Sequence, residues 1–189
     1  MTSDHVDSVY FSELSERVLS IPLDIQEEFV NAIFNAIKRG NSIYVAGNGG
    51  SAAISMHFVT DLIKIGIDLK CRISAYDLTS NNSLLTCVSN DYGYNRVFEY
   101  QLRNFASKGD LFIALSSSGN SENILNALEA CQEFGLEAWA IIGFEKSKAV
   151  NFRVNAIELK LQVGQYGIAE DVTAALCHKV AYGLRARFS

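Results

Sequence analysis

Two short stretches rich in glycine and serine carry the residues best suited to hold an anion. The first, GNGGS (47–51), supplies Asn48, Gly49, Gly50 and Ser51. The second, SSSGNS (116–121), supplies Ser116, Ser117, Ser118 and Ser121. Glycine lets the backbone come close to a ligand, and serine hydroxyls donate hydrogen bonds. If a helix follows each stretch, its unpaired N–H groups and the positive end of its dipole favour a phosphate. For either stretch alone, a simple capped turn is the alternative.

A nucleotide loop fits the first stretch less well. A dinucleotide fingerprint needs a third glycine where Ala52 stands, and Asp77 is the only candidate for its acidic residue. The chain contains no GxxxxGK[ST] pattern, which excludes a P-loop. Two glycine–serine stretches in one chain therefore favour another kind of anionic ligand.

Ionisable residues of a different kind follow the first stretch and recur near the end of the chain. His57 and Asp61 are four residues apart, which places them on one face of a helix. Such a pair can chelate a divalent metal or couple a base to a carboxylate, although an ordinary surface pair is the alternative. Near the end of the chain, Glu170 precedes His178 by eight residues, about 12 Å of helix. One metal touching both would need side chains stretched toward each other or ligands from two subunits.

Alternating strands and helices are predicted to position these residues. Apolar runs predict strands at 42–47, 70–76, 110–116, 138–144 and, more weakly, 156–161. Three- and four-residue periodicity and terminal signals predict helices at 9–19, 23–39, 51–65 (stopped by Gly66), 94–106, up to 134 (capped by Gly135) and 168–187. Apolar strands that alternate with helices indicate an α/β fold with a parallel sheet covered on both faces. Ligands bind such sheets at the carboxyl ends of the strands, where both glycine-bearing stretches fall.

The composition limits the class of protein. The 189 residues suit one domain, and the net charge of −5 argues against a nucleic-acid partner. No apolar run reaches the roughly 20 residues that span a bilayer, and the first residues do not resemble a signal peptide. Four cysteines are widely spaced, and Cys71, Cys87 and Cys131 are predicted to be buried and reduced. We therefore expect a cytoplasmic protein without a membrane or nucleic-acid partner.

These motifs together resemble the sugar-isomerase (SIS) domain and, within it, the phosphoheptose isomerases. The resemblance covers nearly the whole chain and rests on GNGGS, on SNDYGYN (89–95), on SSSGNS and on the spaced histidines. It implies a three-layer αβα sandwich with a five-stranded parallel sheet, of flavodoxin-like or Rossmann-like type, with extra N-terminal helices. It also implies a single SIS domain over 1–189: helices at about 7–39 for oligomerisation, a core at about 42–163 and a final helix at about 168–187.

The resemblance further implies an activity and a site. Phosphoheptose isomerases convert sedoheptulose 7-phosphate to D-glycero-D-manno-heptose 7-phosphate through an enediol, typically as homotetramers with active sites between subunits. By resemblance, Ser116, Ser117, Ser118 and Ser121 bind the phosphate, and Asn48, Gly49, Gly50, Ser51, Asn90, Asp91 and Glu170 contact the substrate. The metal or acid/base positions match His57, Asp61, Glu170 and His178, which hold one Zn²⁺ in the members that contain zinc. We expect Asp61 and His178 to be the proton-transfer pair. In the family a glutamate stands at the position of Asp61 and a glutamine at that of Glu170.

A non-catalytic SIS protein is the alternative. One branch of the family serves as an adaptor for a replication initiator, and other SIS domains sense sugar phosphates for regulation. The adaptor branch commonly loses the catalytic residues. Because His57, Asp61 and His178 are all retained here, the enzyme is favoured.

Overall fold

A five-stranded parallel sheet forms the centre of the protein. The computed structural model describes residues 3–188, with side chains from residue 9 onward. The strands lie in the order β2-β1-β3-β4-β5 and all run parallel. Their bounds are β1 (Ile43–Gly47), β2 (Ala75–Asp77), β3 (Leu111–Ser116), β4 (Glu137–Phe144) and β5 (Asn155–Leu161). This order has its switch point between β1 and β3, where the connections leave in opposite directions.

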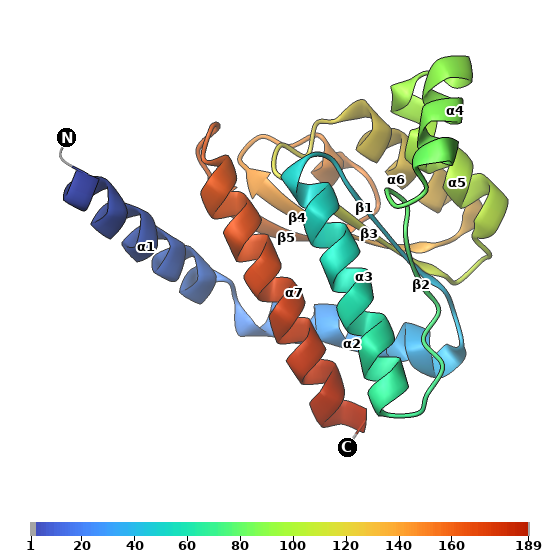
Figure 1. The fold of residues 1–189 in the computed structure, drawn as a ribbon, viewed down its shortest axis with the longest axis horizontal. Helices are drawn as coiled ribbons and strands as arrows, with labels where there is room; N and C mark the ends of the chain where they lie inside the picture. Colours follow the sequence, from blue (N-terminus) through green and yellow to red (C-terminus); the bar gives the residue numbers. More distant parts are fainter. Residues whose placement is uncertain (1–2, 189) are drawn as a thin grey trace.

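Helices cover both faces of this sheet (Figure 1). The helices are α1 (Ser3–Ser20), α2 (Leu23–Arg39), α3 (Gly50–Asp68), α4 (Asn82–Tyr92), α5 (Val97–Phe105), α6 (Glu122–Phe134) and α7 (Tyr166–Phe188), with short 3₁₀ turns η1 (Tyr94–Arg96) and η2 (Ala149–Asn151). Helices α2, α3 and α7 contribute to one hydrophobic cluster, and α4, α5 and α6 to the other. Helix α1 reaches beyond the sheet and packs on α7. The three-layer αβα sandwich predicted from the sequence is confirmed.

The alternation of side chains along the central strands explains the two clusters. In β1, Ile43 and Val45 enter the cluster beneath α2, α3 and α7, whereas Tyr44 and Ala46 enter the opposite one. Because both faces are covered, the strand is apolar throughout instead of alternating with polar residues. Strand β5 lies at the sheet edge, and its residues alternate between buried and exposed. This edge position explains the weaker strand pattern in the sequence.

Two glycines predicted to end helices behave differently. Gly135 caps α6 in the left-handed conformation, with φ of 71°, as predicted. The prediction that Gly66 stops α3 is wrong, because the helix continues to Asp68. A Cβ at Gly66 would lie 2.8 Å from the carbonyl oxygen of Cys71. Gly66 therefore permits a close approach of the chain that follows the helix.

The segment after α3 departs most from the prediction. The strand predicted at 70–76 is reduced to Ala75–Asp77. Helix α4 was not predicted; the Asn81 side chain accepts a hydrogen bond from the Leu84 N–H and caps it. Only Val88 of this helix is buried, so the helix lacks the apolar stripe on which the prediction relied.

The cysteines and the helices bear on the remaining structural predictions. All four cysteines are free; Cys131 and Cys177 are buried, and Cys71 is partly buried. The prediction that Cys87 is buried is wrong, because it lies on the exposed side of α4.

No helix among residues 3–188 is both long enough and apolar enough to cross a membrane.

Candidate functional site

The two glycine–serine loops meet in one pocket at the carboxyl ends of β1 and β3. Gly47 and Leu115 are paired in the sheet, so the loops that follow them are neighbours at the switch point. The pocket has a volume of about 280 Å³. It is lined by Asn48, Gly49, Gly50, Ser51, Leu115, Ser116, Ser117, Ser118, Ser121, Tyr166 and Glu170. Helices α3 and α6 begin here, so the N–H groups of two helix starts face one small space.

The serines of the second loop divide into two kinds. The buried Ser116 hydroxyl accepts a hydrogen bond from the Gly119 N–H at 3.0 Å, and the Ser118 hydroxyl accepts one from the Asn120 N–H at 3.1 Å. Within the described part of the chain, the hydroxyls of Ser117 and Ser121 have no hydrogen-bond partner. Ser116 and Ser118 therefore shape the loop by accepting these bonds. All four hydroxyls keep a hydrogen to donate to a ligand, because accepting a bond uses only a lone pair.

The serine loop is fixed from outside by the segment that follows β4. The Ser147 hydroxyl donates to the Gly119 carbonyl at 3.1 Å, and the Lys148 N–H donates to the Asn120 side chain at 2.8 Å. Gly119 has φ of 61°, and a Cβ there would overlap the Ser147 side chain. The loop thus requires glycine at this position and is held in one shape before a ligand arrives.

Glu170 brings a carboxylate to the edge of the same pocket. Its carboxyl group lies against Gly50, so closely that a Cβ at residue 50 would overlap it. Gly49, just before α3, has φ of 56° and ψ of −124°, a conformation that favours glycine. The two glycines therefore leave the first turn of α3 open to both Glu170 and a ligand.

Asn48 connects the two loops through hydrogen bonds with Asn123 and Tyr94, which were not among the predicted site residues. Its amide exchanges two hydrogen bonds with Asn123, each 2.9 Å long. The Tyr94 hydroxyl donates to the Asn48 side-chain oxygen at 2.8 Å. Asn123 follows SSSGNS by two residues and Tyr94 lies within SNDYGYN, so position in these motifs was the only available signal.

A second group of candidate residues lies further along the paired helices α3 and α7. His57 and His178 approach at 3.3 Å between their Nε2 atoms. Asp61 Oδ2 lies 3.6 Å from His57 Nε2 and 3.9 Å from His178 Nε2. The histidines are exposed and Asp61 is half-buried. The structure therefore brings together three residues that the sequence separates by up to 121 positions.

The three side chains fit a single zinc ion. Zn²⁺ binds imidazole nitrogen and carboxylate oxygen at 2.0–2.2 Å, so tetrahedral ligands stand about 3.4 Å apart. The donor atoms of His57, Asp61 and His178 have separations close to this value. Three protein donors would leave the fourth position of such an ion open, as in catalytic zinc sites. Cys177, next to His178 in the sequence, is buried in the core and is not among the clustered donors.

The fourth predicted metal ligand and two predicted substrate-binding residues of α4 lie apart from this group. Glu170 lines the loop pocket and is not among the clustered donors, as its distance of eight residues from His178 along α7 requires. Asn90 and Asp91 are exposed near the end of α4 and hydrogen-bond to each other at 2.7 Å. Neither lines the loop pocket. The SNDYGYN segment instead reaches that region through Tyr94.

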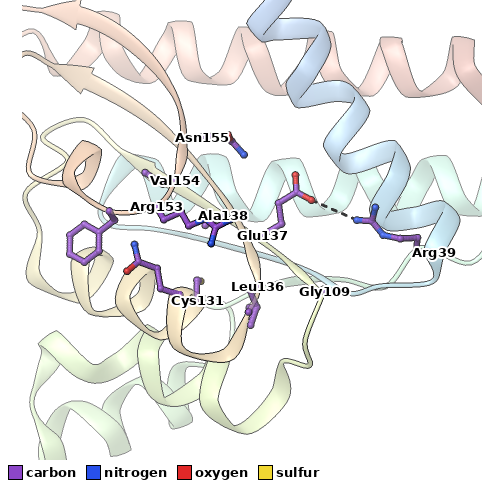
Figure 2. Close-up of a pocket in the computed structure, with 12 residues that line it drawn as sticks. Arg39, Gly109, Cys131, Leu136, Glu137, Ala138, Arg153, Val154 and Asn155 are labelled. Atoms are coloured by element: carbon purple, nitrogen blue, oxygen red, sulfur yellow. Dashed lines mark ion pairs between the residues drawn. The ribbon is translucent and has the colours of Figure 1, made fainter.

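A pocket larger than the loop pocket lies at the opposite end of the sheet (Figure 2). It measures about 860 Å³ and includes the residues that precede or begin β3, β4 and β5, Gly109, Glu137 and Asn155 among them. Arg39 in this pocket pairs with Glu137 at 3.6 Å. Burial raises the pKa of the Cys131 thiol to about 12, so it is unreactive near neutral pH. None of the predicted site residues lines this pocket.

The fold and the loop pocket define a doubly wound α/β protein with a pocket of glycine and serine residues at its topological switch point. The model of the SIS domain matches residues 10–143. The chain belongs to the SIS domain family.

Relatives within this family are similar over most of their length. The phosphoheptose isomerase of Aliarcobacter butzleri is 42% identical over 136 residues, which cover 72% of each chain. A probable phosphoheptose isomerase of Thermoplasma volcanium is 37% identical over 161 residues, 85% of this chain and 81% of the relative. A phosphoheptose isomerase structure from Neisseria gonorrhoeae superposes with a TM-score of 0.87 at 24% identity, covering 98% of this chain and 100% of the other. This last similarity establishes the shared fold.

Proposed function

We propose that the protein is an aldose–ketose isomerase that converts sedoheptulose 7-phosphate to D-glycero-D-manno-heptose 7-phosphate. The observation that carries this proposal is the combination of the two-loop pocket with the His57–Asp61–His178 group on the same pair of helices. An anion site without ionisable groups would suit a binding protein, whereas an isomerase also needs groups that move protons. Relatives named phosphoheptose isomerase support this choice of substrate.

The phosphate of the substrate is proposed to occupy the loop pocket. Ser117 and Ser121 offer free hydroxyls, and the starts of α3 and α6 offer backbone N–H groups. No lysine or arginine lines this pocket, so the neutral donors and helix dipoles supply the attraction.

The length of the substrate suits the separation of the two groups. Seven residues of α3 separate Gly50 from His57, which corresponds to about 10 Å. Seven carbons and a phosphate ester, with bonds of about 1.5 Å, extend over about 10 Å as well. This match in length supports placing C1 and C2 of a heptose phosphate near the ionisable group when its phosphate is held at the loops.

Asp61 and His178 are proposed to carry out the proton transfer. One group removes a proton from C1 of the ketose while O2 is protonated, which gives the enediol. The O1 proton is then removed and a proton is delivered to C2, which gives the aldose. Because His57, Asp61 and His178 lie so close together, their side chains can exchange protons with O1, O2, C1 and C2 of one bound substrate. Fixing the substrate at its phosphate end holds these atoms in the reactive geometry.

One Zn²⁺ is proposed at this group, held by His57, Asp61 and His178. The donor separations and the mixed nitrogen and oxygen donors support it. The bound ion would polarise the substrate carbonyl. It would also occupy the lone pair of His178 Nε2, so His178 would transfer a proton only when this nitrogen is released from the ion, whereas Asp61 has a second carboxylate oxygen that stays free. Glu170 is proposed to contact the substrate from the pocket edge. Glu170 would bind the metal only if its side chain moved toward His178 or if it came from a partner subunit.

A homotetramer with active sites between subunits is proposed on the same basis. Large apolar side chains flank the histidine group: Met56 is 47% exposed and Tyr182 is 76% exposed. Further apolar side chains are exposed on α1, among them Phe11 and Leu19. Burial of these surfaces by second copies would cover the group from water. The four free cysteines support the proposed cytoplasmic location.

Turnover of sedoheptulose 7-phosphate by the purified protein, with and without added Zn²⁺, tests this proposal. We expect His178→Ala and Asp61→Ala to abolish turnover while leaving inorganic phosphate binding nearly unchanged. Ser121→Ala should instead weaken phosphate binding about ten-fold, because a hydrogen bond to a charged group is lost. Thr60→Ala is the matched control for Asp61→Ala, since Thr60 is an exposed neighbour on α3 whose hydroxyl bonds only to the Met56 carbonyl. Tight binding of the substrate without turnover under either condition would contradict the proposed activity and favour a sensor.

A further inference from the structure

We infer that Asn123 and Tyr94 are positioning residues that hold the Asn48 amide in one orientation at the sugar end of the loop pocket. This inference rests on the proposed function, because it assigns how that site recognises the sugar and not only the phosphate. It extends the site to two residues outside the set assigned by resemblance. The three side chains come from three separate parts of the chain: the loop after β1, the start of α6 and η1.

Counting the hydrogen bonds of Asn48 shows which of its atoms remains available. Its side-chain oxygen accepts from both Asn123 Nδ2 and the Tyr94 hydroxyl, at 2.9 and 2.8 Å. Its Nδ2 donates one hydrogen to Asn123 Oδ1 at 2.9 Å. An amide nitrogen carries two hydrogens, and within residues 9–188 the second has no acceptor. Asn48 is therefore fixed as a donor, with one free N–H in a residue that lines the pocket.

Asn123 gives this arrangement its rigidity. It is 2% exposed and lies in the first turn of α6, two residues after Ser121. Loss of hydrogen bonds by a buried amide costs free energy, so the reciprocal pair between Asn123 and Asn48 is stable. The pair ties the first loop to the helix that begins at the second loop. It thereby sets the distance between the phosphate donors and the Asn48 N–H.

Tyr94 supplies the second donor from a position near solvent. The residue is 57% exposed, so its hydroxyl is not needed to fill the core. The turn that carries it is anchored, because Asn126 of α6 donates to the Asn95 carbonyl at 2.8 Å. Tyr94, Asn48 and Asn123 also line a second hollow beside the loop pocket. The hydroxyl thus sits in a hollow that adjoins the loop pocket through Asn48 and Ser121.

Removal of the Tyr94 hydroxyl is the first test. We expect Tyr94→Phe to lower kcat/KM for sedoheptulose 7-phosphate about five-fold, the effect of one hydrogen bond, with an unchanged melting temperature and unchanged affinity for inorganic phosphate. Tyr92→Phe is the matched control, since Tyr92 is exposed on the neighbouring turn and its hydroxyl has no partner among the described residues. Equal losses in the two variants would overturn the inference.

A double-mutant cycle separates positioning from general structural support. In an Asn48→Ala background, Tyr94→Phe should have no further effect on kcat/KM, because the group it positions is gone. Asn123→Ser should lower kcat/KM at least ten-fold in the wild-type background and much less in the Asn48→Ala background. Additive effects in the cycle, or a parallel loss of inorganic phosphate affinity, would overturn the inference. Tyr94→Phe carries the test if Asn123→Ser does not fold.

Binding measurements keep this test distinct from that of the proposed function. If the wild-type protein shows no turnover, the proposed activity fails, and the cycle is measured by calorimetry instead. The quantity is then the ratio of affinities for sedoheptulose 7-phosphate and inorganic phosphate. The inference predicts that Tyr94→Phe and Asn123→Ser lower this ratio only when Asn48 is present. An unchanged ratio, or wild-type protein that does not prefer the sugar ester to phosphate, would overturn the inference.

Discussion

Gly143 offers a direct way to move the serine loop without altering any group that binds the ligand. It lies in β4, beside the irregular register with β5, and is buried against the loop. A Cβ at this position would lie 2.8 Å from the Ser117 carbonyl oxygen and 2.9 Å from the Ala169 Cβ. Both neighbours are fixed parts of the backbone or directly attached to it, so neither can rotate away.

The size of the displacement follows from these distances. Ordinary contact begins at 3.4 Å, so the Gly143→Ala variant must open the space between β4 and the loop by about 0.5 Å. Overpacking of this kind costs about 1–3 kcal/mol of stability. A misplacement of 1 Å can cost about 100-fold in rate, so half that distance predicts about a ten-fold loss in kcat/KM. Inorganic phosphate should also bind several-fold more weakly, because the displaced atoms belong to its proposed site.

Gly66→Ala is the matched control for this experiment. A Cβ at Gly66 would lie 2.8 Å from the Cys71 carbonyl oxygen, the same crowding near the distant end of α3. Both variants should lose similar stability in urea unfolding. Only Gly143→Ala should lose phosphate affinity by calorimetry and kcat/KM by a turnover assay. The reasoning is refuted if Gly143→Ala binds phosphate as the wild type does, or if the two variants lose activity equally.

Three further predictions concern the metal group, the pocket edge and the contact between α1 and α7. Asp61→Asn should weaken Zn²⁺ binding at least ten-fold in a competition assay with a chelating dye, because the site loses its carboxylate charge. Gly50→Ala should lower kcat with little change in the free energy of unfolding, since the added Cβ displaces only the end of the flexible Glu170 side chain. A hydrogen bond to Asp171 raises the pKa of Tyr10 from 10.0 to about 12. Its stabilisation is fully present below pH 10 and lost as the pH rises through 12, so the unfolding free energies of wild type and Tyr10→Phe should converge over that range.

The parts of the fold that were predictable are those buried on two sides or along one stripe. The helix at 23–39 was predicted with correct bounds, because its apolar residues recur at three and four positions and Gly40 ends it with φ of 76°. Strands β1 and β3 were predictable because both faces are buried. Helix α4 was missed because one residue of it is buried, and β2 was overextended because a three-residue edge strand leaves little pattern.

The candidate site divides along the same lines. Loops that precede helices can be located from glycine and serine spacing, and the i, i+4 pair of His57 and Asp61 follows from helix geometry. The approach of this pair to His178 depends on how α3 packs against α7, and the spacing of residues along the chain does not predict that packing. Asn123 and Tyr94 were missed for the same reason, since they meet Asn48 across 75 and 46 residues.

The central claim is that the chain moves a proton between C1 and C2 of sedoheptulose 7-phosphate. Incubation with this substrate and Zn²⁺ in D₂O, followed by NMR, measures it directly. The account predicts an aldoheptose 7-phosphate that carries solvent deuterium at C2, and no such product with His178→Ala. Absence of the aldoheptose from reactions of the folded wild-type protein, with and without Zn²⁺, would contradict the account.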